Sequence, residues 1–239
     1  GLTQQYGVSV IEDASHAIGG KYKNKLIGNC NYSDITVFSF HPVKLVTTGE
    51  GGIAVTNDPQ LASTMTLLRS HGVTRNPFEM KQKSEAPCYY EQVLLGLNYR
   101  MTDIQAALGL SQLGRLDQYI ERRNFLARRY DEKLAESGLV TPYIGHDCQS
   151  AFHLYVIRVR DEHASKSTLF KATQEAGIGV NVHYRPIYRQ PYYESMGFKE
   201  GYCPVAERYY REAMTLPLFP TMTTSQQDFV IETLCRHLS

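Results

Sequence analysis

The chain has 239 residues and nearly balanced charge, with 25 Lys and Arg residues against 24 Asp and Glu residues and a net charge of +1. Its length fits one large or two modest domains, and its charge gives no field that favours nucleic acid or an acidic membrane as a partner. The five cysteines never fall in a CxxC spacing and no apolar run reaches the length of a membrane helix, so we expect a protein of the reducing cytoplasm without a disulfide framework or a zinc site.

The first predicted strand covers residues 8–12 and leads to an acid. Asp13 follows it directly, at the carboxyl end of the strand, where open α/β sheets bind their ligands. His16 lies three residues further along a short helical turn, which brings it close to Asp13 on one side. Residues 19–28 contain alternating lysines and are typical of a solvated hairpin at an exposed edge.

The next predicted strand, residues 35–40, and its exit loop are the stretch around which we expect the fold to be organised. The strand is rich in β-branched and aromatic residues. Lys44 follows it, where burial can lower the pKa of the amine and make it a nucleophile toward a carbonyl group. The glycines of residues 49–52 let the backbone turn and pass close to a bound group. The alternative is that Lys44 is a solvated surface lysine, as most lysines are.

Strands and helices alternate after this loop. Residues 53–56 form another predicted strand, and Asp58 and Pro59 have the residue types of a helix N-cap and first turn, for a helix that stops at Gly72. Strands separated by helices predict a mainly parallel α/β sheet. Residues 73–92 lack periodicity and are interpreted as a long loop, and loops of this length are usually functional or mobile.

A long helical region joins the two halves of the chain. Thr102 or Asp103 can cap its beginning, and small residues in the helix that follows suggest close packing. Residues 113–134 continue helically with a charged surface. We place the domain boundary here, so that residues 1–115 belong to the larger domain and residues 116–239 form the linking helix and a smaller domain.

Five further segments define the smaller domain. Strands are expected at residues 151–159 and 179–184, and helices at residues 166–176, 205–214 and 225–238. This mixture predicts an α+β fold for the C-terminal part.

Asp13 and Lys44 together suggest the chemistry of pyridoxal phosphate (PLP). An enzyme that uses this cofactor needs a lysine to hold the aldehyde and a carboxylate to keep the pyridine nitrogen protonated, and both residues stand at predicted strand ends. The same lysine can act as general base and then general acid. Ser39 can donate its hydroxyl to the cofactor phosphate or simply cap the strand end. Without a cofactor, His16 would be a hydrogen-bonded core histidine.

Three segments give the chain a resemblance to a known family. Residues 12–17 (EDASHA), 38–52 and 96–101 (GLNYRM) resemble the DegT/DnrJ/StrS family of PLP-dependent nucleotide-sugar aminotransferases, in family order and with matching separations. The resemblance spans essentially the whole chain. It implies an α/β fold-type I transferase, in which residues 1–115 are the remainder of the large, mostly parallel-sheet PLP-binding domain.

The resemblance also implies a role for each candidate site residue. Lys44 would be the Schiff-base lysine, Asp13 the partner of the pyridine nitrogen, His16 a neighbour of the ring and Ser39 a contact of the phosphate. Asn98 would reach the phosphate from the opposite subunit of a homodimer with a shared active site, although spacing alone favours a turn or capping residue. Arg100 is a weaker candidate for the substrate, since an arginine beside a helix start is often a surface group. No metal is implied.

Within the family, residues 41–44 and the helix at residues 108–116 resemble the branch that acts in pseudaminic acid synthesis. That branch implies glutamate as amino donor and a UDP-linked 4-keto-6-deoxy N-acetylhexosamine as acceptor, with UDP-4-amino-4,6-dideoxy-N-acetyl-altrosamine as product. Residues 182–188 resemble the small-domain segment that faces the active site. This would place His183 and Tyr184 near the donor carboxylate or the sugar, while an edge strand with ordinary polar residues is the alternative.

Two features depart from the family pattern. Residues 31–34 stand where relatives commonly carry a Gly-Asp pair, which alters a turn. Relatives also have a long segment before the point where this chain starts, and it supplies a phosphate loop at a helix N-terminus and the ring that stacks on the cofactor. We therefore expect a truncated chain that binds PLP weakly or not at all and is poorly active alone.

Other functions are compatible with parts of this pattern. The same enzyme fold can act on another nucleotide sugar or at another sugar position, and spacing does not separate these activities. A sugar 3-dehydratase is disfavoured because those relatives replace the Schiff-base lysine with histidine. A non-catalytic sensor or dimerisation module could keep the fold, but it has less need of the proton-transfer lysine, Lys44.

Overall fold

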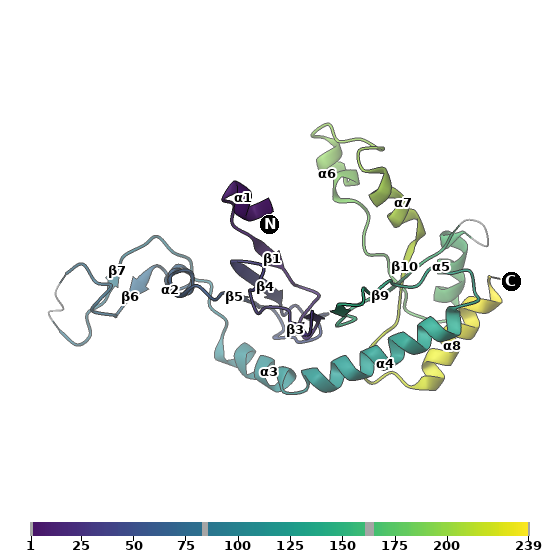
Figure 1. Cartoon of the computed structure of the whole chain (residues 1–239), viewed down its shortest axis with the longest axis horizontal. Helices are drawn as coiled ribbons and strands as arrows, with labels where there is room; N and C mark the ends of the chain where they lie inside the picture. The colour runs from purple at the N-terminus through teal and green to yellow at the C-terminus, as the bar shows by residue number, and fades with distance from the viewer. Residues whose placement is uncertain (1, 83–85, 161–164, 239) are drawn as a thin grey trace. The chain divides into compact units, whose positions relative to one another are not determined.

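The computed structural model describes residues 2–82, 86–160 and 165–238, and the chain divides into two compact units, Gly1–Leu116 and Asp117–Ser239 (Figure 1). Residues 1 and 239, the outer limits of the predicted domains, lie outside the described residues. Within the described ranges, no helix has both the length and the apolar character that crossing a bilayer requires.

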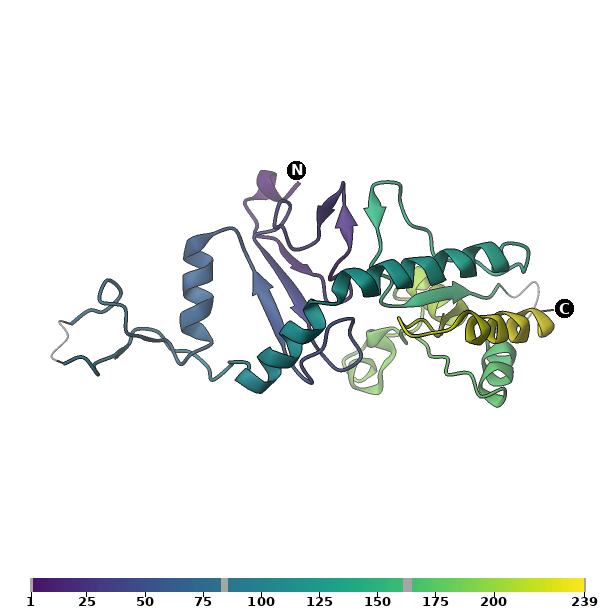
Figure 2. The same ribbon diagram turned by 90° about the horizontal axis from the view of Figure 1, so that it is seen from below.

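Unit 1 contains a three-stranded sheet (Figure 2). Its strands are β1 (Ile11–Asp13), β4 (Ile35–Ser39) and β5 (Gly52–Val55), in the order β1-β4-β5. β1 and β4 are parallel, whereas β4 and β5 are antiparallel. The prediction of parallel pairing is therefore wrong for β4 and β5. No helix separates these two strands, so the chain turns back after β4 and pairs with it in the opposite direction.

The start of the chain also differs from the predicted strand at residues 8–12. A short helix, α1 (Leu2–Tyr6), comes first, and β1 begins only at Ile11 and includes Asp13. The expected hairpin at residues 19–28 is confirmed as β2 (Lys21–Tyr22) and β3 (Lys25–Leu26), which pair antiparallel.

The region predicted as a long loop contains two short strands. β6 (Val73–Thr74) and β7 (Glu91–Gln92) pair antiparallel. Two-residue strands are too short to show an alternating pattern, so the periodicity of the sequence could not reveal them.

Two helices of unit 1 begin at the predicted caps. The Asp58 carboxylate accepts hydrogen bonds from the backbone at the start of α2 (Pro59–Leu68). Thr102 and Gln105 form a reciprocal capping box at the start of α3 (Asp103–Leu113), an arrangement that satisfies backbone N–H groups otherwise left without a partner.

The predicted continuous helix over residues 113–134 is interrupted. α3 ends at Leu113 and α4 (Leu116–Leu134) begins after a turn at Gly114 and Arg115. Glycine has a low helix propensity, and here it separates a helix without buried residues from one that carries six.

Unit 2 is a mixed α and β structure built on α4. Its other elements are β8 (Cys148–Gln149), β9 (Tyr155–Arg158), α5 (Lys166–Glu175), η1 (Ile187–Arg189), α6 (Pro191–Glu194), α7 (Pro204–Glu212), β10 (Ala213–Leu216) and α8 (Thr224–Arg236). β9 and β10 pair antiparallel. The predicted helices at 166–176 and 225–238 are confirmed with small shifts of their ends, whereas the strand predicted at residues 151–159 is confirmed only over residues 155–158, as β9.

Two predictions for unit 2 are wrong. No described strand covers residues 179–184, where only an isolated bridge joins Asn181 to Thr215. The helix predicted to reach residue 214 ends at Glu212, and Ala213–Leu216 forms β10. All four residues of β10 are buried, so the strand lacks the polar and apolar alternation that identifies a half-buried strand.

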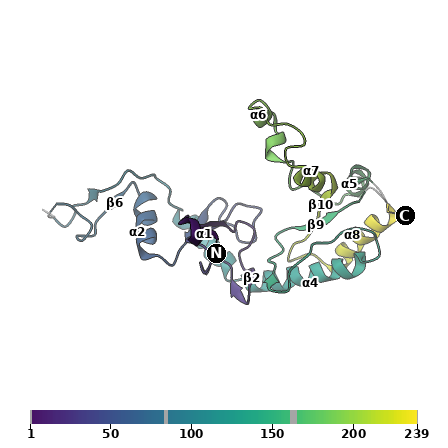
Figure 3. The ribbon, with the colours of Figure 1, turned by 45° about the horizontal axis from the view of Figure 1, so that its top comes forward.

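The core of unit 2 forms between α4, α8 and the β9–β10 pair (Figure 3). Leu126 and Tyr130 of α4 have no exposed surface. The Gln227 side chain of α8 is equally buried, and its amide donates a hydrogen bond to the Leu126 carbonyl at 2.7 Å. A buried amide satisfied in this way fixes how the two helices pack.

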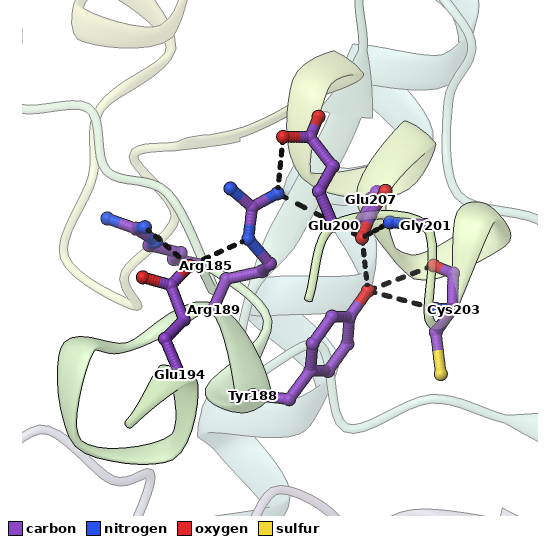
Figure 4. A network of polar contacts seen from close by, with 8 residues as sticks. All are labelled: Arg185, Tyr188, Arg189, Glu194, Glu200, Gly201, Cys203 and Glu207. Atoms are coloured by element: carbon purple, nitrogen blue, oxygen red, sulfur yellow. Dashed lines mark hydrogen bonds and ion pairs between the residues drawn. The ribbon is translucent and has the colours of Figure 1, made fainter. Parts of the chain in front are cut away.

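A polar network holds the segment from η1 to α7 (Figure 4). The Arg189 guanidinium contacts Glu194 at 3.0 Å and Glu200 at 3.1 Å. The Tyr188 hydroxyl donates to the buried Glu207 carboxylate at 2.7 Å, and this hydrogen bond holds the pKa of Glu207 below its ordinary value. The network replaces hydrophobic packing in a segment with few buried apolar residues.

Candidate active site

Asp13 is the last residue of β1 and lies opposite Val37 of β4. Its carboxylate accepts a hydrogen bond from the Ser15 hydroxyl at 2.5 Å and another from the Ser15 backbone N–H at 3.0 Å. These two bonds lower the pKa of Asp13, and the charges of His16 and Lys44 lower it further. Asp13 is therefore held as a carboxylate.

Lys44 lies in the loop that leaves β4. Its backbone N–H donates to the His41 carbonyl at 2.9 Å, which closes a turn just before it. Leu45 and Val46 follow with only 5% and 1% of their surface exposed, and they anchor the loop in the interior. Burial lowers the pKa of the half-buried Lys44 amine, and the charge of Asp13 partly offsets that effect.

The structure brings Asp13 and Lys44 within electrostatic reach of each other. Each charge shifts the pKa of the other group toward its ionised form. The reason is topological: β1 and β4 are parallel, so their carboxyl ends meet at the same edge of the sheet. An acid that stays ionised and an amine that loses its proton more easily than a solvated lysine thus share this edge.

Ser39 belongs to the same face of the sheet as Asp13. Residues opposite each other on paired strands project to one side, and side chains alternate along a strand. Asp13 is opposite Val37, and Ser39 is two residues further along β4, beside Gly52 of β5. The Ser39 hydroxyl accepts a hydrogen bond from the His41 N–H at 3.4 Å. The neighbouring glycine leaves this face without a bulky side chain next to Ser39.

His16 interacts electrostatically with Asp13, and its charge lowers the pKa of the Asp13 carboxyl. Its side chain is exposed, and its electrostatic effect on Asp13 is larger than that of Lys44. The sequence therefore predicted four residues that the fold of unit 1 places at one edge of the sheet: Asp13, His16, Ser39 and Lys44.

Helix α3 supports the Lys44 loop from one side. The Gln105 amide donates to the Glu50 carbonyl at 3.1 Å. A Cβ atom on Gly109 would lie 2.7 Å from the Thr48 methyl group, so only glycine permits this close approach. Gly109 is thus one of the small residues that were expected to favour close packing of this helix.

The remaining predicted site residues lie elsewhere. Asn98 forms an isolated bridge with Ser70, and Arg100 lines a pocket beside that residue. In the described part of the chain no hydrogen bond or ion pair joins either of them to Asp13 or Lys44. His183 and Tyr184 belong to unit 2.

His183 and Tyr184 differ in their contacts. His183 Nδ1 is 2.7 Å from the Thr215 hydroxyl, and its ring packs edge-to-face against Tyr184 with ring centres 4.6 Å apart. The Tyr184 side chain is 65% exposed. Within unit 2, His183 is thus held by β10, and Tyr184 presents an open aromatic surface.

Ser15 is the site residue that sequence reasoning missed. It makes the two strongest contacts of Asp13. An Asp side chain often accepts hydrogen bonds from the residue two positions later in a local turn. The sequence Asp13-Ala14-Ser15 therefore indicated that Ser15 could bond to Asp13.

The residues at this edge fit the PLP that the sequence suggests. Asp13 is ionised, as a partner for a protonated pyridine nitrogen must be. Lys44 has a lowered pKa, as a nucleophilic amine requires, and Ser39 supplies a hydroxyl on the same face.

Comparison with protein families gives one match over nearly the whole chain. The model of the DegT/DnrJ/EryC1/StrS aminotransferase family matches residues 1–235.

Among curated proteins, the spore coat polysaccharide biosynthesis protein SpsC of Bacillus subtilis is 39% identical over 97% of the chain and 60% of its own length. The UDP-4-amino-4,6-dideoxy-N-acetyl-beta-L-altrosamine transaminase of Campylobacter jejuni is 36% identical over 98% of the chain and 59% of its own length. The chain thus spans about three fifths of the length of these relatives.

Solved structures show the same likeness. PseC of Helicobacter pylori, an aminotransferase involved in the biosynthesis of pseudoaminic acid, superimposes with a TM-score of 0.87 at 29% identity, over 99% of the chain and 61% of its own. Spr1654 of Streptococcus pneumoniae in its PLP-form gives 0.84 at 31% identity, over 99% of the chain and 59% of its own.

Proposed function

The chain belongs to the DegT/DnrJ/EryC1/StrS aminotransferase family, and on this premise we propose that it carries the catalytic lysine and acid of a PLP-dependent sugar aminotransferase. The reaction would move an amino group from glutamate to the keto group of a nucleotide-linked sugar. The observation that carries this proposal is the meeting of Asp13 and Lys44 at one sheet edge, each acting on the charge of the other.

The predicted fold class is confirmed by the likeness to solved sugar aminotransferases, which are fold-type I PLP-dependent transferases. In this family PLP supplies an electron sink that makes a proton on the substrate carbon next to the nitrogen removable. Lys44 would hold the aldehyde, Asp13 the protonated ring nitrogen and Ser39 the phosphate, with His16 beside the ring.

Each of these side chains has a physical property that suits its role. The Ser15 hydrogen bonds keep Asp13 negatively charged, so it would stabilise a proton on the ring nitrogen. Half-burial of Lys44 lowers its pKa, which increases the fraction of neutral amine that can take up a proton from the substrate carbon and return it. The buried Leu45 and Val46 limit how far that amine can move.

We further propose a homodimer in which Asn98 and Arg100 serve the site of the second copy, and a cytoplasmic location. Support comes from the position of Asn98, which lies against Ser70 rather than beside Lys44. The proposed division of labour assigns cofactor binding to residues 1–115, with the linking helix and small domain in residues 116–239. His183 and Tyr184 would approach the donor carboxylate or the sugar.

For the acceptor, we propose a UDP-linked 4-keto-6-deoxy N-acetylhexosamine, as in pseudaminic acid synthesis. The similarity to the Campylobacter transaminase and to PseC supports this choice. Another nucleotide sugar is the second candidate, because the chain is also similar, at 39% identity, to SpsC, a protein of spore coat polysaccharide biosynthesis.

The test is turnover by the holoenzyme with glutamate and a panel of UDP- and dTDP-linked 4-keto sugars, with release of 2-oxoglutarate as the readout. We expect release with the UDP-linked N-acetylhexosamine. Turnover of dTDP-linked sugars alone would remove the pseudaminate assignment and keep the aminotransferase. Absence of 2-oxoglutarate with every sugar, and with glutamate alone in a single turnover, would favour a non-catalytic sensor.

A further inference from the structure

The loop that carries Lys44 is closed at its base by backbone hydrogen bonds. The Phe40 N–H donates to the Gly51 carbonyl at 2.8 Å, and the Thr48 N–H donates to the Phe40 carbonyl at 3.0 Å. Residues 48–51, which we call the return limb, therefore lie against the residue at which the loop leaves β4. A shift of the return limb would move the base of the loop and the lysine within it.

The Glu50 carbonyl is the point at which a helix is attached to the return limb. It accepts the Thr48 hydroxyl at 2.7 Å from within the limb and the Gln105 side-chain amide at 3.1 Å from α3. A carbonyl oxygen has two lone pairs, so these two donors use both. Thr48 is only 2% exposed and Gln105 is half-buried, so water competes weakly for this carbonyl.

Gln105 uses the two ends of its side-chain amide for different purposes. Its oxygen accepts hydrogen bonds from the Thr102 N–H and the Thr102 hydroxyl, both at 3.0 Å, as part of the capping box that begins α3. Its nitrogen donates to the Glu50 carbonyl. One end must accept and the other must donate, so the orientation of the amide is determined. A single side chain thus joins the helix cap to the Lys44 loop.

Close approach of the backbones supports this hydrogen bond. Gly109, whose close contact with Thr48 is described above, is one turn beyond Gln105 and so on the same side of α3. A Cβ atom on Gly51 would lie 2.8 Å from the Met101 methyl group, just before the helix. Because α3 has no buried residue, burial of apolar surface contributes little to holding it against the limb. The Gln105 hydrogen bond therefore has a large share in fixing how helix and loop meet.

We propose that Gln105 is a positioning residue of the active site, which holds the return limb and thereby the place of the Lys44 amine. The inference rests on the proposed function, in which Lys44 binds PLP and moves a proton. Gln105 acts through the Glu50 carbonyl and takes no part in the proton transfer. Misplacement of a reacting group by about 1 Å can slow a reaction by about a hundredfold, so loss of this hydrogen bond should lower the rate of the chemical step.

Four variants separate the loop contact from the helix cap. Gln105→Glu keeps an oxygen for the capping box, which accepts either residue type, but it loses the N–H that reaches Glu50. Gln105→Met loses both functions without adding charge. Thr102→Ala weakens the cap and leaves the Gln105 amide able to donate. Gln112→Glu is the charge-matched control, because Gln112 is on the same helix and its side chain makes no hydrogen bond to the return limb in the described part of the chain.

Hydrogen–deuterium exchange of the cofactor-free chain shows whether the loop is loosened. Peptides that cover residues 40–51 should exchange about tenfold faster in both Gln105 variants, the factor that corresponds to one hydrogen bond. They should exchange at the unmodified rate in Thr102→Ala and Gln112→Glu. A merely structural role of Gln105 would instead speed exchange throughout unit 1.

Steady-state kinetics of the holoenzyme give the second readout. The kcat for 2-oxoglutarate release should fall by about tenfold or more in both Gln105 variants, with the KM for glutamate unchanged, because the amide is proposed to place the lysine and not to bind the donor. Thr102→Ala and Gln112→Glu should keep the unmodified kcat.

Two results would overturn the inference. One is unchanged exchange and unchanged kcat in both Gln105 variants. The other is an equal loss in Thr102→Ala and Gln105→Met with none in Gln105→Glu, which would assign the effect to the helix cap. The unmodified holoenzyme tests the proposed function separately. If it releases no 2-oxoglutarate while residues 40–51 still exchange faster in the Gln105 variants, the aminotransferase assignment is wrong and the attachment of the loop to α3 is confirmed.

Discussion

Unit 1 and unit 2 hold their residues in place by different means. Unit 2 has one continuous hydrophobic cluster, in which Leu126 and Tyr155 have no exposed surface. In unit 1 the buried apolar residues of the described chain are Ala14, Leu45 and Val46. Ala14 directly follows Asp13 and the other two directly follow Lys44, so packing in unit 1 is concentrated under the candidate catalytic residues. The candidate catalytic residues Asp13 and Lys44 and the large hydrophobic cluster thus lie in different units.

The helices repeat this contrast. α2 and α3 contain no buried residue, and Ile104 of α3 is 85% exposed, whereas α4 buries six residues. An exposed apolar side chain contributes little to folding stability within the chain. Substitutions should therefore divide into those that change activity and those that change stability.

The largest expected effect is loss of activity in unit 1 without loss of stability. Lys44→Ala removes the amine proposed to hold the cofactor and move the proton, and we expect 2-oxoglutarate release to fall by about a thousandfold or more. Its half-buried side chain makes no ion pair with a described residue, so the urea midpoint followed by circular dichroism should stay within error. Retained turnover would show that Lys44 is not needed for activity. A large fall in the urea midpoint would show that Lys44 also contributes to stability.

The second effect is loss of stability in unit 2. Leu126→Ala leaves a cavity in the fully buried cluster, and such a change costs about 2–5 kcal/mol. Urea unfolding followed by circular dichroism measures it, since the chain has no tryptophan. Phe125→Ala is the matched control, because Phe125 is the preceding residue of α4 and is 42% exposed. Equal costs for the two changes would show that the cluster does not carry the stability.

A smaller effect concerns the ionisation of Asp13. The Ser15 hydroxyl is the largest cause of its lowered pKa, so Ser15→Ala should raise that pKa toward the ordinary value of 3.8. A carboxyl with a lowered folded pKa favours folding above its unfolded pKa, and this contribution is lost as the pH falls through the folded value. The acid limb of the activity profile should move to higher pH, with less than about tenfold loss at neutral pH.

The control for that measurement is Ser33→Ala. The Ser33 hydroxyl bonds to Thr36, which lies opposite Glu12 and so on the other face of the sheet from Asp13. This variant should keep the acid limb where it is. An acid limb that moves equally in both variants would show that Ser15 has no specific effect on Asp13.

The smallest expected effect is that of a substitution at an exposed apolar residue of α3 in unit 1. Ile104→Ala removes an apolar side chain that is 85% exposed, and surface substitutions usually change stability by no more than about 0.5 kcal/mol. The urea midpoint of the full chain should therefore not move. A loss as large as that of Leu126→Ala would mean that α3 is packed in solution.

Local signals in the sequence predicted much of the fold. Asp58 is predicted as a helix cap, and Thr102 as one of two candidates with Asp103, because a side-chain oxygen placed before a helix satisfies its first N–H groups. The convergence of Asp13 and Lys44 could be anticipated because ligands gather at the carboxyl ends of parallel strands. Their roles followed from the family resemblance rather than from spacing.

What sequence reasoning missed depends on contacts between distant segments. β10 is buried on both sides and has no alternation, and its pairing with β9 joins residues more than fifty positions apart. A pocket of unit 1 gathers Ser70, Arg75, Tyr90 and Arg100 from four separate stretches. No local pattern connects these stretches, so only the fold reveals that Arg75 and Arg100 line one pocket.

We propose that Lys44, beside an ionised Asp13, is the residue that binds the cofactor. Borohydride reduction of the holoenzyme with PLP, followed by peptide mapping, tests it directly. We expect the label on Lys44 in the unmodified protein and no label in Lys44→Ala, while exposed lysines such as Lys21 and Lys25 stay unlabelled. Label on another lysine, or none at all, would contradict it.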